Sequence, residues 1–189
     1  MRLLGLLGIL GGTVLLAAFV IGIPDGANDV RLALYILGAI AVAIGIHRRQ
    51  AAAAPRLSLA IAAGAVLANG WCLAMIVLAR GQEPPFRGDF WLLFDVAFLA
   101  MWLADAAVGF AALRIGVVTR LGAAALAIGS LLAILGMDRL GLSSASDITI
   151  FGRLGLTGVA LNGVAWILLG LDVALGGMPA LRRRPALAR

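Results

Sequence analysis

The sequence predicts an all-helical membrane protein, a bundle of six transmembrane helices with both termini in the cytoplasm. Three observations predict this class. Hydrophobic residues make up 63% of the 189, charged residues only 13%, and the mean hydropathy is +1.09, unlike a soluble domain. Six apolar runs have about the length that crosses a bilayer. Arginine gathers at one set of run ends, as the bias of cytoplasmic segments toward positive charge expects.

The predicted spans form a single integral membrane domain, residues 1–189. They are, in order, residues 3–23, 30–46, 57–79, 90–113, 121–137 and 148–175. The first follows the short basic start at Arg2. Its length of about 21 residues exceeds the usual 7 to 15 of a signal-peptide core, and no clear cleavage site follows, so we interpret it as a retained helix. A cleaved signal peptide is the alternative.

The connections between these runs contain residues that end helices. A turn at Pro24 precedes the second span, which ends at a His-Arg-Arg sequence, residues 47–49. Residues 80–89 contain Glu83 and two adjacent prolines, and are too polar and too proline-rich to be helix in lipid. The remaining connections are an alanine-rich linker at 51–55, a basic turn at 114–120 and a serine-rich loop at 138–147.

Arginine placement orients the predicted bundle. All 15 basic residues are Arg, which is typical of a GC-rich bacterial genome. The side of the N-terminus carries Arg2, Arg48, Arg49, Arg56, Arg114, Arg120, Arg182, Arg183, Arg184 and Arg189. The opposite side carries Arg31, Arg80, Arg87 and Arg139, together with six of the acids. We therefore expect both termini in the cytoplasm of a bacterium, with the protein in its inner membrane. The net charge of +6 then follows from topology and implies no nucleic-acid partner.

The fourth span carries two carboxylates inside an apolar run. At about 100° per residue, six of its residues share an arc of roughly 80°. They are Trp91, Asp95, Phe98, Trp102, Asp105 and Gly109. A carboxylate at membrane depth usually faces the protein interior or a wet cavity. We therefore expect a buried polar seam formed by Asp95, Asp105 and Trp102 of this span together with Asn69, Ser130 and Asn162. Asp105 is nearer the midplane and is expected to be the more function-linked acid.

Arg153 lies in the first turns of the sixth span and is expected to belong to the same seam. At 1.5 Å per residue it lies about 13 Å from the midplane and Asp95 about 9 Å, on helices that run in the same direction. A long Arg side chain closes such a gap, so a salt bridge between Asp95 and Arg153 is predicted. Extension of Arg153 to the outer surface is the alternative.

Glycine spacing predicts how the spans pack. Glycines repeat every seven residues in four spans, which keeps a smooth strip on one helix face and predicts close helix packing. They are Gly5 and Gly12; Gly38 and Gly45; Gly122, Gly129 and Gly136; and Gly163, Gly170 and Gly177. The third and sixth spans also share a Leu-Ala-Asn-Gly-like pattern around Asn69 and Asn162. This match is too short to establish an inverted repeat, and chance similarity is the favoured interpretation.

Catalytic and cofactor patterns are not found in the sequence. Ser130 lacks the surrounding motif and the histidine partner of an intramembrane serine protease, and the lone His47 lies at a membrane edge. Asp95 and Asp105 lie on one helix, about 15 Å apart along its axis, so they cannot form an aspartyl dyad. The only cysteine, Cys72, is interpreted as a core residue. No cofactor and no metal are expected.

Two function classes remain open. The favoured one is a non-catalytic accessory or oligomeric membrane component, whose polar residues fix helix register through interhelical hydrogen bonds. The alternative is a small-solute or proton-coupled transporter that uses Asp105 and Asp95. The expected partners are the lipid bilayer and either a second copy of the chain or another membrane protein. An enzyme is the least supported class, because no nucleophile, base and metal combination is visible.

Overall fold

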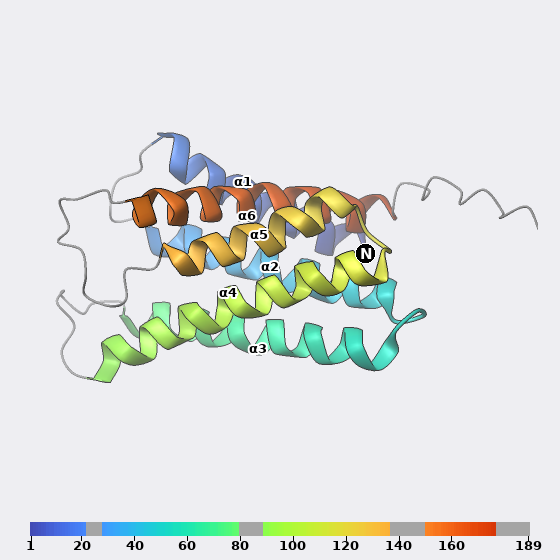
Figure 1. Ribbon diagram of the computed structural model, residues 1–189, viewed down its shortest axis with the longest axis horizontal. Coiled ribbons are helices and arrows are strands. Elements are labelled where there is room, and N and C mark those ends of the chain that lie inside the picture. The colour runs from blue at the N-terminus through green and yellow to red at the C-terminus, as the bar shows by residue number, and fades with distance from the viewer. Residues whose placement is uncertain (22–27, 80–88, 137–149, 177–189) are drawn as a thin grey trace, which may run out of the picture.

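The computed structural model describes residues 1–21, 28–79, 89–136 and 150–176 (Figure 1). Across these residues the fold is all-helical and contains six helices, which confirms the predicted all-helical class. They are α1 (Arg2–Ile21), α2 (Asn28–Gln50), α3 (Pro55–Ala79), α4 (Asp89–Ile115), α5 (Arg120–Leu135) and α6 (Ile150–Leu175). The predicted connections at Pro24, Glu83 and residues 138–147, and the arginines at 182–184, lie outside the described residues.

Four of the helices are long and apolar enough to cross a membrane. These stretches are Val30–Gln50, Pro55–Ala79, Leu92–Ile115 and Arg153–Leu175. The apolar stretches Arg2–Ala17 in α1 and Arg120–Leu135 in α5 are shorter. At 1.5 Å per residue, the 16 residues of α5 extend about 24 Å, somewhat less than the ~30 Å of a bilayer core.

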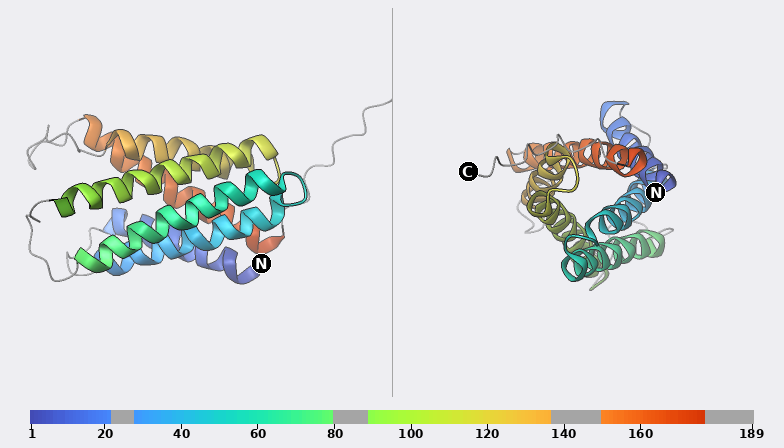
Figure 2. Two further views of the ribbon diagram at one scale, coloured as in Figure 1. Left: turned by 90° about the horizontal axis from the view of Figure 1, so that it is seen from below. Right: turned by 90° about the vertical axis from the view of Figure 1, so that its right-hand side faces the viewer.

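The six helices close into a ring. Each helix packs against the next one along the chain, and α1 packs against α6 (Figure 2). Helix α2 also contacts α6 and, more sparsely, α4, so it lies toward the inside of the ring. The start of α1 and the end of α6 lie at the same end of the bundle (Figure 1).

Glycines make the closure between α1 and α6 possible. A Cβ atom added to Gly12 would lie 2.5 Å from the carbonyl oxygen of Gly163, and one added to Gly170 would lie 2.7 Å from the carbonyl oxygen of Gly5. The heptad spacing in α1 therefore matches the heptad spacing in α6, in antiparallel register. This confirms the predicted close packing for both helices, apart from Gly177, which lies outside the described residues.

The same kind of contact joins α5 to α6. A Cβ atom on Gly158 would lie 2.3 Å from the backbone nitrogen of Ala133 and 2.6 Å from the carbonyl oxygen of Gly129. Not every glycine serves this purpose, because a Cβ on Gly64 of α3 would meet nothing within 4 Å. Helix α3 thus has an outward face that no other described element covers at that point.

The inside of the ring is filled by large apolar side chains together with polar ones. The largest fully buried side chains include Tyr35, Ile36, Met101, Leu126, Trp166 and Leu169. Asn69, Asp105, Ser130 and Asn162 are equally buried, with at most 1% of their surface exposed. By contrast, leucines such as Leu67 and Leu121 are more than 70% exposed on the outer faces. The bundle therefore encloses a few polar groups within an apolar core and is apolar on its outside.

Candidate functional site

Asp105 of α4 lies at the centre of a hydrogen-bond network that connects four helices. Its Oδ1 accepts a bond from Nδ2 of Asn69 on α3 at 3.0 Å, and its Oδ2 accepts one from the hydroxyl of Tyr35 on α2 at 3.3 Å. The Tyr35 hydroxyl accepts in turn from Nε1 of Trp166 on α6 at 3.1 Å. We call these four side chains, Trp166, Tyr35, Asp105 and Asn69, the Asp105 network.

Helical periodicity explains how α4 contributes to this network. Trp102 and Asp105 are three residues apart, so they share one helix face, and both are buried. The Trp102 ring packs against the Tyr35 ring, with centroids 6.1 Å apart and planes tilted by 45°. Because buried Tyr and Trp side chains require partners for their O–H and N–H groups, the network also satisfies the polar atoms of two large core residues.

A second polar pair lies next to the Asp105 network. The Ser130 hydroxyl of α5 donates to Oδ1 of Asn162 on α6 at 3.0 Å, and Nδ2 of Asn162 donates to the Gly158 carbonyl one turn back at 3.0 Å. Asn162 precedes Trp166 by four residues and therefore lies on the same face of α6. The pair extends the line of buried polar groups from α3 to α5.

Asn69 carries an atom that the surrounding protein leaves unpaired. Its Nδ2 donates both to Asp105 and to the Ala65 carbonyl at 3.0 Å, while its Oδ1 is buried and has no hydrogen-bond partner within the described part of the chain. An unpaired buried acceptor costs about 1 to 3 kcal/mol. The Asp105 network is therefore closed except at this one oxygen.

The structure brings together five of the seven residues that the sequence assigned to the polar seam. Asp105, Asn69 and Trp102 meet around Tyr35, and Ser130 meets Asn162. Asp95 is half-buried on α4, about 15 Å along the helix axis from Asp105. The structure thus separates Asp95 from the Asp105 network.

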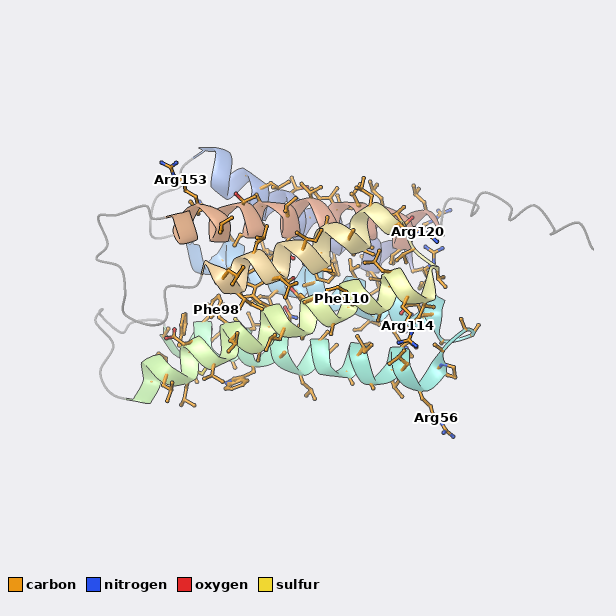
Figure 3. The ribbon with its side chains drawn as sticks, in the orientation of Figure 1. Arg56, Phe98, Phe110, Arg114, Arg120 and Arg153 are labelled. Atoms are coloured by element: carbon orange, nitrogen blue, oxygen red, sulfur yellow. The ribbon has the colours of Figure 1, made fainter. Side chains whose placement is uncertain are left out.

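The predicted salt bridge between Asp95 and Arg153 is wrong. Arg153 is exposed, and its side chain points away from the bundle (Figure 3). The helices that carry the two residues, α4 and α6, are not neighbours in the ring, because α5 lies between them. The prediction rested on the similar depths of the two residues along their helices, but depth does not fix the position of a helix around the ring. Arg153 instead matches the alternative in which its side chain extends outward.

A separate polar contact, not predicted from the sequence, fixes the basic end of the bundle. Arg49 of α2 donates from its two terminal nitrogens to the carbonyl oxygens of Asp172 (2.7 Å) and Gly176 (3.0 Å), at the end of α6. The Asp172 carboxylate accepts from the backbone nitrogen of Thr119, just before α5. These contacts join α2, α6 and the connection from α4 to α5.

Sequence reasoning also missed Tyr35 and Trp166 as members of the Asp105 network. Tyr35 is the only tyrosine of the chain and lies in an otherwise apolar run, which is the signal that could have identified it.

Among the described residues, no three His, Cys, Asp or Glu side chains gather closely enough to hold a metal ion. The site is a buried polar network inside a helical ring. No known protein family, curated protein or solved structure matches this chain.

Proposed function

We propose that the chain is an integral protein of a bacterial inner membrane, with the start of α1 and the end of α6 in the cytoplasm. Charge at the two ends of the bundle supports this orientation. The described arginines at the end that contains the start of α1 are Arg2, Arg48, Arg49, Arg56, Arg114 and Arg120, whereas Arg31 and Arg153 lie near the starts of α2 and α6, at the opposite end. Figure 3 labels Arg56, Arg114 and Arg120 at the first end and Arg153 at the other. Cytoplasmic segments carry such an excess of positive charge.

The distribution of side chains supports membrane embedding. Leucines on the outer faces remain exposed, and the buried polar groups point to the centre of the ring. A soluble protein with this much exposed apolar surface would aggregate, whereas lipid solvates it. Reporter fusions after Gln50 and after Ser144 test the orientation. We expect a cytoplasmic signal from the first and an external signal from the second, and the reverse would overturn the topology.

Within that membrane, the favoured function is a non-catalytic accessory or oligomeric component. The observation that carries this proposal is the closure of the Asp105 network. Asp105 is fully buried and both carboxylate oxygens accept hydrogen bonds from neighbouring helices. Such bonds fix the register of helices in lipid, at about 0.6 to 2 kcal/mol each. A buried carboxyl group with both oxygens paired is the arrangement expected of a structural residue.

Asp105→Asn compared with Asp95→Asn tests this function. The asparagine at position 105 replaces one of the two carboxylate oxygens by an NH2 donor, so the hydrogen bond that this oxygen accepts, from Asn69 or from Tyr35, is lost. We expect the midpoint of unfolding to fall further for Asp105→Asn, at the fully buried position, than for Asp95→Asn, at the half-buried one. Equal stability of both variants would contradict the structural role.

A transporter that uses Asp105 and Asp95 is the second candidate, and one observation favours it. Within the described residues Asp105 has only Asn69 and Tyr35 as partners and no cation, and Oδ1 of Asn69 is unpaired. A neutral carboxyl group or a hydrogen-bonding solute would fit there. Proteoliposomes containing a trapped pH indicator test it. If the unmodified protein conducts protons and Asp105→Asn abolishes this proton flux, transport is favoured over the accessory function.

A further inference from the structure

A groove lies between the first turn of α1 and the last turn of α6, at the basic end of the bundle. Its volume is about 490 Å³, and it is lined by Met1, Arg2, Leu6, Ala174, Leu175 and Gly176. Most of these side chains are apolar, while Arg2 is exposed and brings a guanidinium group to the rim. The groove therefore combines an apolar wall with a positive charge.

A second guanidinium group, that of Arg49, bonds to Gly176, one of the residues that line this groove. Arg49 donates to the carbonyl oxygen of Gly176 at 3.0 Å and to that of Asp172 at 2.7 Å. The carbonyls at a helix C-terminus carry a partial negative charge that would repel an anion. Because Arg49 occupies two of them, that repulsion is offset, and a positive charge remains next to the groove.

Basic groups outnumber acidic ones among the described residues at the basic end. Asp172 is the one described acid there; it is buried, and its carboxylate is bonded to the backbone nitrogen of Thr119. The other charged or titratable side chains described at this end are basic or neutral. They are His47, Arg48, Arg56, Arg114 and Arg120. This end of the bundle therefore carries net positive charge, of which Arg2 lines the groove and Arg49 bonds to the lining residue Gly176.

Exposed leucines continue from the groove toward the middle of the bundle. On α1, Leu6 is followed one turn later by Leu10, with exposed fractions of 56% and 48%. On α6, Leu175 is preceded one turn earlier by Leu171, at 67% and 40%. The two helices are antiparallel neighbours, so both rows run the same way from the groove along the outside of the α1 and α6 pair.

We propose that this groove binds an anionic phospholipid. The phosphate lies between Arg2 and Arg49, and an acyl chain lies along the two leucine rows. The chemistry is that of a basic site between transmembrane helices on the cytoplasmic side, where anionic headgroups concentrate. This inference rests on the proposed membrane location, because only a bilayer supplies both the headgroup and the chain.

Lipid retention by the purified full-length protein tests the site. The protein is reconstituted in nanodiscs containing equal parts of phosphatidylglycerol and phosphatidylcholine, released into detergent, and its bound lipids are counted by native mass spectrometry. We expect preferential retention of phosphatidylglycerol. Arg2→Gln is expected to lower that preference about fivefold, as one arginine contact near a membrane surface implies. Arg56→Gln is the matched control, because Arg56 is exposed at the same end on α3, away from the groove (Figure 3).

Three results would overturn the proposal. Equal losses for Arg2→Gln and Arg56→Gln would mean a general basic surface without a site. Equal retention of the two lipids would mean that the phosphate charge is not recognised. Displacement of the bound lipid by soluble glycerol phosphate would mean that the acyl chain contributes nothing. In all three cases the protein still inserts into the bilayer, so the proposed function stands; failure to insert would refute both together.

Discussion

Substitution of Gly158 by alanine is expected to destabilise the bundle by separating α5 from α6. The added Cβ would lie 2.3 Å from the backbone nitrogen of Ala133 and 2.6 Å from the carbonyl oxygen of Gly129. Ordinary contact needs more than 3.4 Å, and backbone atoms cannot rotate away, so the helices must move apart by about 1 Å. Overpacking of this kind costs about 1 to 3 kcal/mol, and we expect the upper end.

Alanine is also a better helix former than glycine, by about 1 kcal/mol. The net destabilisation for Gly158→Ala is therefore about 2 kcal/mol. Gly64→Ala on α3 is the matched control, since its Cβ meets nothing within 4 Å and only the gain in helix propensity remains. The two variants should then differ by about 3 kcal/mol in their free energies of unfolding.

Unfolding of the purified variants in mixed micelles, titrated with a denaturing detergent and followed by circular dichroism, measures this difference. Gly158→Ala should unfold at a lower detergent fraction than the unmodified protein, and Gly64→Ala at an equal or higher one. Equal midpoints for the two variants, or the opposite order, would refute the close approach of α5 and α6 at this glycine.

Three further predictions concern the polar contacts. Tyr35→Phe removes two hydrogen bonds, so we expect a loss of about 1 to 3 kcal/mol and a shifted Trp166 fluorescence; an unchanged spectrum and stability would contradict the contact. Ser130→Ala and Asn162→Ala should be non-additive by about 0.6 to 1.7 kcal/mol in a double-mutant cycle of unfolding energies, whereas strict additivity would exclude the bond. Arg49→Gln removes the guanidinium group that binds the carbonyls of Asp172 and Gly176, so amide hydrogen exchange in the last turn of α6 should become faster, with α5 as the internal reference. An unchanged exchange rate would argue that Arg49 does not stabilise this helix end.

The composition of the polar seam could be predicted to a large extent from the sequence. Helical periodicity places Trp102 and Asp105 on one face, and a polar side chain in an apolar span has a strong reason to turn inward. Asn69 and Asn162 follow from the same reasoning. Tyr35 was missed although it is the one hydroxyl group in its apolar run, because a phenol is tolerated both in a core and near a membrane surface, and a single residue carries no periodicity.

Position around the ring could not be predicted in the same way. Counting residues gives the depth of Arg153 along its helix, but which helices are neighbours depends on how their faces fit together. Here the fit between Gly12 and Gly163 closes the ring, while the close approaches at Gly109 and Gly158 pack α5 against both α4 and α6. The shared sequence pattern around Asn69 and Asn162 likewise does not give the two residues equivalent contacts. Each bonds its own preceding turn, but Asn69 reaches forward to α4 and Asn162 backward to α5.

The closure of the ring between its first and last helices has a consequence for how the protein is made. Helix α1 leaves the ribosome first, and its partner surface on α6 is synthesised last. Until then the glycine face of α1 has no α6 to pack against, and the Tyr35 hydroxyl has no Trp166 donor. An unfinished chain is therefore chemically distinct from a finished one. A membrane protease or chaperone that recognises an unsatisfied helix face could use this one junction to tell them apart.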